Sequence, residues 1–274
     1  MTTTTHTSTT SFTTSADGTE IAYDVTGAGP ALVLVDGAMC FRGLGPSRGL
    51  AAALADRFTV YAYDRRGRGE SGAGSSPYDL QREVEDLVAI LGAAGGSAHV
   101  SGVSSGAALA LEAARQGAAV DRLAVYEAPF IVDDSHPAND VRLPERVQEM
   151  VDNGHRADAV RTFLRVVGAP APFVALMRFM PAWKQMTAIA HTLPYDLSIV
   201  VPRQQGHPLP DGCYDDVAAD TLVLAGGKSP AYMRNAQAAI AAAVPRARLV
   251  TLPGQTHMVK PKVVSPVLAE FLLG

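Results

Sequence analysis

Residues His99-Val100-Ser101-Gly102-Val103-Ser104-Ser105-Gly106 carry the strongest structural signal in the chain, a serine between glycines at the junction of two elements. The run His99–Val103 before this serine is typical of a buried strand. The alanine-rich run Ser105–Gln116 after it predicts a helix. A sharp turn at Ser104, between a strand and a helix, is the context in which a Gly-x-Ser-x-Gly motif exposes a nucleophilic hydroxyl.

Strand and helix patterns alternate on both sides of this turn. The expected strands are Phe12–Thr14, Glu20–Val25, Ala31–Val35, Thr59–Tyr63, His99–Val103, Arg122–Tyr126, Thr221–Ala225 and Arg248–Leu252. The first two flank an Ala-Asp-Gly turn and predict an antiparallel hairpin. The serial alternation that follows predicts an α/β fold, in which a mostly parallel sheet of the eight-stranded type is flanked by helices.

The helices expected between these strands have different characters. They are Leu50–Leu54, Asp79–Leu91, Ser105–Gln116, one that follows Ser229-Pro230 and one that opens at Ser265-Pro266. Apolar residues recur at helical spacing within Asp79–Leu91, which predicts an amphipathic helix. Polar residues lie between them: Gln81, Arg82, Glu83, Glu85 and Asp86.

The alternation stops from about Pro129 to Gly212, where the pattern is mostly helical with proline and glycine interruptions. We therefore expect residues 129–212 to form a helical cap, inserted between two strands of the sheet. Residues 11–128 and 213–274 would then form the α/β core. Residues 1–10 are dominated by threonine and serine, and we expect them to be a disordered tail.

The composition excludes several classes of protein. Of the 274 residues, 47% are apolar and 18% are charged, which is too apolar for an intrinsically disordered chain. The formal net charge of -4 indicates no broad basic surface for nucleic acid. No apolar run approaches the length of a membrane helix, and no signal-peptide pattern occurs. We expect a cytoplasmic protein with a small-molecule substrate and no membrane partner; no pattern indicates the oligomeric state.

A serine hydroxyl needs a base to act as a nucleophile near neutral pH, and histidine has a suitable pKa. Of the seven histidines, only His257 lies on a loop just after a predicted strand of the sheet, where it can reach Ser104. We predict His257 as the general base. The two cysteines and the scattered histidines form no metal-ligand pattern, so we expect neither a metal nor a cofactor.

Three motifs in this order resemble the α/β-hydrolase family over nearly all of the chain after about residue 12. They are the Gly102–Gly106 turn, the arginine- and glycine-rich loop Asp64–Gly72, and Gly254-Gln255-Thr256-His257 after the last strand. The resemblance implies a serine hydrolase, similar to an esterase, with an inserted helical lid.

The acid that would orient His257 departs from the commonest pattern of that family. Many relatives carry an aspartate just after the penultimate strand, but Gly226-Gly227-Lys228-Ser229-Pro230 contains no carboxylate. Glu127, directly after the strand Arg122–Tyr126, is the natural substitute. Asp133 and Asp134 are the next candidates, and a site without an acid is also open.

The oxyanion loop departs from the family pattern as well. Relatives often have His-Gly after the central strand, whereas this chain has Asp36-Gly37-Ala38-Met39. Backbone N–H groups form an oxyanion hole, so the side-chain change need not abolish it. We predict the Ala38 N–H as the partner of the Ser105 N–H, with Met39 next. Asp36 is open to two interpretations, an anchor of the loop or a catalytic group.

The cap is expected to supply an apolar wall above Ser104, with Met39, Met177 and Trp183 in contact with substrate. The predicted function is hydrolysis of an ester or lactone of a small, moderately hydrophobic molecule through an acyl-enzyme. Two alternatives stay open. One is other chemistry of the same fold, such as C–C bond hydrolysis, a lyase or a ring-forming enzyme. The other is a binding protein that uses the pocket without turnover.

Overall fold

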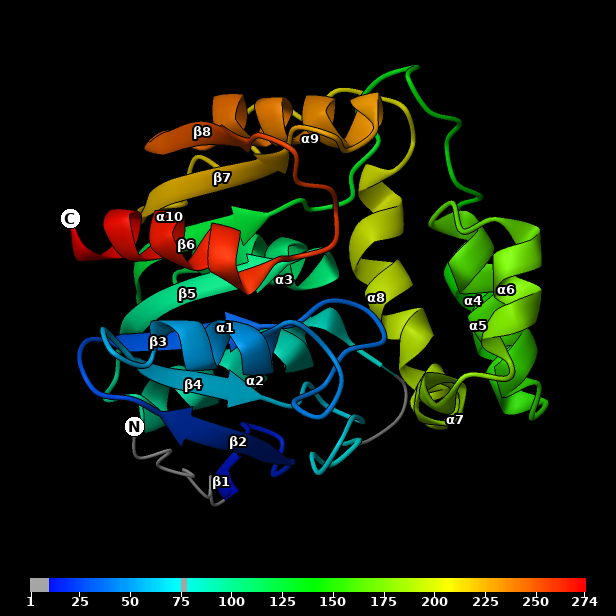
Figure 1. Cartoon of the computed structure of the whole chain (residues 1–274), viewed down its shortest axis with the longest axis horizontal. Helices are drawn as coiled ribbons and strands as arrows, with labels where there is room; N and C mark the ends of the chain where they lie inside the picture. The colour runs from blue at the N-terminus through cyan, green and yellow to red at the C-terminus, as the bar shows by residue number, and fades with distance from the viewer. Residues whose placement is uncertain (1–9, 75–77) are drawn as a thin grey trace.

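All the strands that the sequence predicts are present. The computed structural model describes residues 10–74 and 78–274, and its sheet has the strand order β1-β2-β4-β3-β5-β6-β7-β8 (Figure 1). The strands are β1 (Ser11–Thr14), β2 (Glu20–Thr26), β3 (Ala31–Val35), β4 (Thr59–Tyr63), β5 (Ala98–Val103), β6 (Val120–Tyr126), β7 (Asp220–Gly226) and β8 (Ala247–Leu252). The pairs β1–β2 and β2–β4 are antiparallel, and every other pairing is parallel. The predicted α/β fold with a mostly parallel sheet is confirmed.

The two faces of the sheet are covered by different helices because side chains alternate along each strand. These helices are α1 (Ser47–Leu54), α2 (Leu80–Ala93), α3 (Ser105–Arg115), α9 (Ala231–Ala243) and α10 (Pro261–Leu273). Leu32 and Leu34 of β3 belong to the cluster formed with α1 and α10, which lie on the near face in Figure 1. Val33 and Val35 belong to the cluster on the other face, with α2, α3 and α9. The continuous apolar run of β3 thus reflects burial on both faces.

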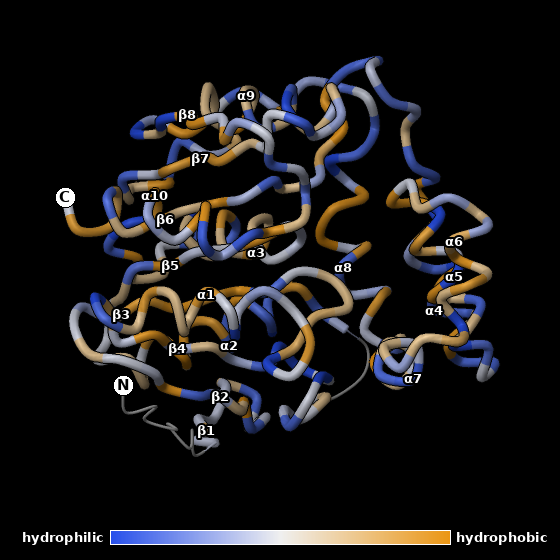
Figure 2. The backbone as a smooth tube through the Cα atoms, viewed as in Figure 1, coloured by the Kyte–Doolittle hydropathy of each residue, from blue (hydrophilic) through white to orange (hydrophobic). Residues whose placement is uncertain are grey.

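The helical interruption lies between β6 and β7. Its helices are α4 (Leu143–Asp152), α5 (Arg156–Val166), α6 (Ala171–Met177), α7 (Pro181–Ala188) and α8 (Leu193–Val200), with short 3₁₀ turns at Ala190–Thr192 and Val201–Arg203. Figure 1 shows them together beyond one end of the sheet, with α8 nearest to the strands. Helix α8 packs on α3 and α2, while α6 and α7 pack on α5. In Figure 2 α8 carries the hydrophobic colour over much of its length, as a helix inside the molecule should.

The expected tail, residues 1–10, lies outside the described residues except for Thr10. The Thr10 hydroxyl donates to Glu70 Oε2 at 3.0 Å. Across residues 10–74 and 78–274, no helix has both the length and the apolar character needed to cross a bilayer. The same residues contain no cluster of His, Cys, Asp or Glu side chains arranged to hold a metal ion.

The last helix begins earlier than its sequence predicts. We expected its start at Ser265-Pro266, but α10 begins at Pro261 and contains Pro266. Pro261 suits the first turn, where a missing N–H costs no intrahelical hydrogen bond. The helix continues through Pro266 because Leu268 and Leu272 remain buried against the sheet, and tertiary packing outweighs one lost backbone bond.

The turn between β5 and α3 depends on the two glycines that flank Ser104. A Cβ added at Gly102 would lie 2.5 Å from the Gly106 carbonyl oxygen. A Cβ added at Gly106 would lie 2.3 Å from the Val35 carbonyl oxygen. Real Cβ atoms do not approach backbone oxygens so closely, so the strand, the helix and the end of β3 meet here only because both side chains are absent.

We expect Gly102→Ala to destabilise the protein by about 1–3 kcal/mol, because the new methyl group forces β5 and α3 apart. The measurement is the free energy of unfolding in urea. Gly92→Ala is the matched control, since a Cβ at Gly92 in α2 has no neighbour within 4 Å. That control should be neutral or stabilising by up to ~1 kcal/mol. Equal unfolding midpoints for Gly102→Ala and the parent would contradict this account of the turn.

Candidate active site

Ser104 occupies a strained position at the carboxyl end of β5. Its backbone has φ 58° and ψ -127°, a conformation that is costly for a residue with a side chain. The Ser104 N–H donates to the Tyr126 carbonyl at 2.9 Å, and its own carbonyl accepts from Ala107. A serine that precedes a helix usually caps it with its hydroxyl, but the Ser104 hydroxyl makes no capping bond. The hydroxyl is therefore available to other groups.

His257 lies on the loop after β8 and reaches the Ser104 hydroxyl. His257 Nε2 is 3.2 Å from Ser104 Oγ, across 153 positions of sequence. The loop is held in place by neighbouring strand ends, because the Tyr126 hydroxyl donates to the Thr256 carbonyl at 2.6 Å. The Lys228 N–H also donates to the Gln255 carbonyl, at 2.8 Å. The His257 side chain is 39% exposed, so the pair is open to solvent.

Glu127 supplies the carboxylate that faces the other nitrogen of His257. Glu127 Oε2 is 2.9 Å from His257 Nδ1, and the Gly226 N–H donates to Oε1 at 2.6 Å. Glu127 is fully buried and has φ 49°, a left-handed conformation that turns the chain sharply at the end of β6. Of the other candidate acids, Asp133 accepts instead from Asn235, at 2.7 Å, and Asp134 is exposed.

The three side chains form one line of hydrogen bonds, from hydroxyl to imidazole to carboxylate. In such a line the carboxylate fixes the tautomer of the imidazole, and the imidazole can accept the hydroxyl proton. The hydroxyl oxygen then becomes able to attack an electrophilic carbon. The three groups come from the ends of β5, β6 and β8, at the edge where parallel α/β sheets commonly carry their sites.

The predicted oxyanion loop lies directly against Ser104. A Cβ added at Gly37 would be 2.8 Å from Ser104 Cβ, so only glycine allows this approach. The Cys40 N–H closes a turn onto the Gly37 carbonyl at 3.3 Å, and Met39 takes φ 61° within it. Ala38 is the second residue of this turn. Ser105 opens α3, where a helix leaves its first N–H groups without intrahelical acceptors.

The three residues predicted to contact substrate have different surroundings. Met39 is 6% exposed and belongs to the main apolar core. Met177 on α6 and Trp183 on α7 are partly buried and pack against the same core. The Arg161 guanidinium lies 5.6 Å above the Trp183 ring, so one face of the indole has a partner inside the cap. A substrate contact of Met177 or Trp183 stays a prediction.

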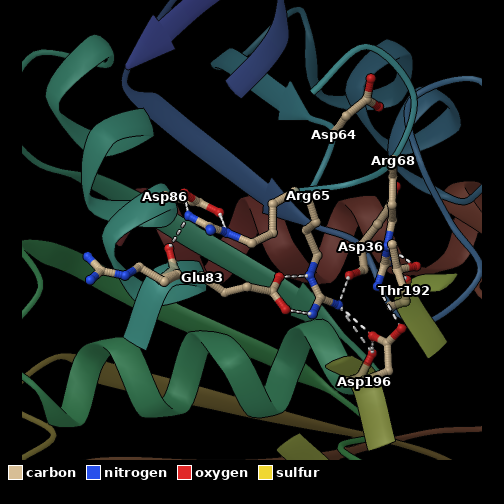
Figure 3. A network of polar contacts seen from close by, with 12 residues as sticks. Asp36, Asp64, Arg65, Arg68, Glu83, Asp86, Thr192 and Asp196 are labelled. Carbon is tan, nitrogen blue, oxygen red and sulfur yellow. Dashed lines mark hydrogen bonds and ion pairs between the residues drawn. The ribbon is translucent and has the colours of Figure 1, made fainter. Parts of the chain in front are cut away.

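A buried network of charged side chains lies beside the oxyanion loop, and sequence reasoning missed it (Figure 3). Arg65 donates to both oxygens of Glu83, at 2.6 and 2.7 Å, and to Asp196 Oδ1 at 2.7 Å. Arg68 donates to Asp196 Oδ2 at 2.6 Å. Burial alone would raise the pKa of Asp196, but the charges of Arg68 and Arg65 outweigh it and lower that pKa. The two arginines therefore favour the ionised form of the Asp196 carboxyl group.

Part of this network had a signal in the sequence. An amphipathic helix would leave its polar residues exposed, yet Glu83 and Asp86 of α2 are each only 1% exposed. Glu83 pairs with Arg65, and Asp86 accepts two bonds of 2.7 Å from Arg66. Three arginines in one short loop followed by acids three positions apart on a helix indicate such pairing. Nothing in the cap sequence singled out Asp196.

Asp36 is buried without a matching partner. It is 2% exposed, and neither carboxylate oxygen has a hydrogen-bond partner in the described part of the chain. Burial raises the pKa of Asp36 to about 6, and the nearby Ser47 hydroxyl and the Arg68 and Arg65 charges offset the rise only in part. The Asp36 side chain therefore changes its charge near neutral pH.

Comparison with known proteins gives relatives over nearly the whole chain. The model of the alpha/beta hydrolase family matches residues 26–264. The crystal structure of an alpha/beta hydrolase from Sphaerobacter thermophilus DSM 20745 has 44% sequence identity and a TM-score of 0.85, and the match covers 95% of this chain and 99% of that chain.

Two other matches are less similar in sequence. An uncharacterized hydrolase from Bacillus subtilis (strain 168) is 27% identical over 155 residues, which are 54% of this chain and 55% of that protein. The chain thus matches only about half the length of this curated relative. The crystal structure of an esterase from Rhodococcus sp. ECU1013 has 21% identity and a TM-score of 0.66, over 97% of this chain and 98% of that chain. At that identity the likeness is one of fold alone.

We expect Asp36→Asn to stabilise the protein increasingly as the pH rises. Because folding raises the pKa of Asp36, its contribution to stability is present below the unfolded pKa and is lost as the pH rises through about 6. Asparagine has no such loss. The difference in free energy of unfolding, variant minus parent, should therefore increase by about 2 kcal/mol between about pH 4 and pH 7. A difference that does not change with pH would contradict the burial of a titrating carboxyl at this position.

Proposed function

This chain belongs to the alpha/beta hydrolase family, and we propose that it is a serine hydrolase that cleaves an ester or lactone through an acyl-enzyme. The observation that carries the proposal is the line of hydrogen bonds through Ser104, His257 and Glu127, with distances of 3.2 and 2.9 Å. Three segments far apart in the sequence converge there. Glu127 is fully buried, and its two carboxylate oxygens lie against His257 Nδ1 and the Gly226 N–H.

The proposed reaction begins with attack of Ser104 Oγ on the carbonyl carbon of the substrate. His257 Nε2 takes the hydroxyl proton, and Glu127 stabilises the imidazolium through Nδ1. The N–H groups of Ala38 and Ser105 donate to the oxygen that becomes negative. His257 then gives its proton to the leaving alkoxide, and the acyl group stays on Ser104. Water, deprotonated by His257, cleaves this acyl-enzyme and restores the serine.

The proposed substrate is uncharged and moderately hydrophobic. Met258, which follows His257 in the sequence, is 74% exposed. Met177 and Trp183 of the cap are partly buried apolar side chains, and the proposal assigns them to the wall above Ser104. Methionine-rich walls adapt their shape to a ligand. A screen of p-nitrophenyl esters of increasing acyl length, together with simple lactones, would identify the preferred class.

We expect a fluorophosphonate probe to form a single adduct on Ser104, visible by intact mass spectrometry and peptide mapping. The adduct requires an activated serine, because an ordinary serine hydroxyl does not react. Ser104→Ala should abolish both the adduct and the turnover of a p-nitrophenyl ester. Ser105→Ala should still form the adduct, because the Ser105 hydroxyl donates to Asp196 and its N–H is retained. A parent protein without adduct or turnover would favour a binding protein or a different reaction.

We expect Glu127→Gln to lower kcat by roughly 10²–10⁴-fold, because glutamine cannot hold the imidazole in the required tautomer. The circular dichroism spectrum should stay unchanged, since glutamine keeps an oxygen for the Gly226 N–H. Asp133→Asn, which changes a carboxylate after the same strand, is the control and should leave kcat within ~2-fold of the parent. The opposite pattern would transfer the role of the acid to Asp133.

A further inference from the structure

Building on the proposed hydrolase, we propose that Arg68 and Asp196 are positioning residues that hold the two N–H donors of the oxyanion hole in place. Arg68 acts on the Ala38 side and Asp196 on the Ser105 side. Because Asp196 belongs to α8, this cap helix becomes part of the support of the reacting centre. No step of the proposed reaction passes through either residue.

Arg68 fixes the orientation of the peptide that carries the Ala38 N–H. Arg68 Nη1 donates to the Gly37 carbonyl at 2.7 Å and to the Cys40 carbonyl at 3.2 Å, so it binds both ends of the turn. A trans peptide is planar, and its C=O and N–H point in opposite directions. With the Gly37 carbonyl held toward Arg68, the Ala38 N–H must point away from Arg68. Without Arg68, the peptide between Gly37 and Ala38 loses a charge-assisted hydrogen bond that opposes its rotation.

Arg68 is itself held by the cap. Its Nη2 donates to Asp196 Oδ2 at 2.6 Å, and its Nε donates to the Thr192 hydroxyl at 3.1 Å. The side chain is fully buried, and all three nitrogens of its planar guanidinium donate hydrogen bonds. A lysine offers one point charge and cannot bridge the turn and the cap in the same way.

Asp196 connects the two sides of the proposed oxyanion hole, and Figure 3 shows its carboxylate beside Arg65 and Arg68. Its Oδ1 accepts from the Ser105 hydroxyl at 2.7 Å and from Arg65 Nη1 at 2.7 Å. Ser105 is the residue whose N–H is the second proposed donor. Arg65 Nη1 also donates to the Asp36 carbonyl at 3.3 Å, directly before Gly37. One carboxylate from the cap therefore contacts Ser105, Arg65 and Arg68 together.

A purely structural ion pair in the same loop offers a matched comparison. Arg66 donates two bonds of 2.7 Å to Asp86, and its side chain is 3% exposed. Its other partners are Asp17 and the Arg82 carbonyl, and none of these contacts involves the oxyanion loop or Ser105. Loss of either Arg66 or Arg68 should therefore lower stability, but loss of Arg66 should leave the proposed oxyanion hole unaffected.

The test compares Arg68→Met, Arg68→Lys, Asp196→Asn and Arg66→Met in one ester assay. For Arg68→Met we expect kcat to fall by roughly 10–100-fold with KM within ~3-fold, because the oxyanion interaction is made in the transition state. Asp196→Asn should lower kcat in the same way, and Arg68→Lys should recover part of the loss. Affinity for phenylboronic acid, whose tetrahedral adduct on Ser104 places an oxygen in the hole, should fall in parallel with kcat. Arg66→Met, with a similar drop in melting temperature, should keep kcat within ~3-fold.

Two results would overturn the inference while leaving the proposed function in place. One is an active parent whose Arg68→Met and Asp196→Asn variants keep both kcat and boronate affinity. The other is a kcat loss in Arg66→Met as large as in Arg68→Met, which would mean that any damage to the loop slows the reaction. If Arg68→Met does not fold, Arg68→Lys and Asp196→Asn decide the question. A parent without ester turnover refutes the proposed function itself, and this inference with it.

Discussion

The close approach of three backbone segments at the carboxyl edge of the sheet is the constraint on which the site depends. The end of β3, the turn from β5 into α3 and the end of β6 meet around Ser104. Gly37 and Gly106 allow this contact, because a Cβ at either position would lie within 3.0 Å of a neighbouring heavy atom. Ser104 and Glu127 both take left-handed backbone conformations there, which cost of order 1–3 kcal/mol each. The buried sheet around them offsets that strain.

The second organising feature is the charge buried between the core and the cap. Arg65, Arg68, Glu83 and Asp196 have side chains that are at most 2% exposed, and each finds oppositely charged partners. Ions in such a place add little net stability compared with apolar groups, but removing one of them leaves the others uncompensated. Through these contacts the network joins α8 to the loop that follows β3. Helices α6 and α7 pack on α5 instead, and Phe173 and Phe179 there are largely exposed.

The fold was predictable because its signals are local. Several strands, such as β3 and β7, are short apolar runs, and β1 and β2 flank a turn, so the positions of all eight follow from periodicity and turn residues. The errors arose where distant packing overrides a local signal. Pro266 is typical of the first turn of a helix, yet it lies inside α10, whose apolar stripe packs against the sheet. Glu83 and Asp86 lie on the polar side of an amphipathic pattern, yet both are buried in ion pairs with Arg65 and Arg66.

The sequence by itself determined the order of the elements, the strand-turn-helix around Ser104, and the candidates His257 and Glu127, because turn chemistry and hydrophobic periodicity act over a few residues. Only the tertiary structure decided which carboxylate faces the histidine: Glu127 lies against His257, Asp133 accepts from Asn235, and Asp134 is exposed. The contacts of Asp196 also follow only from the tertiary structure. Asp196 contacts residues more than 90 positions away, and the residues next to Asp196 in the sequence carry no pattern that would predict such contacts.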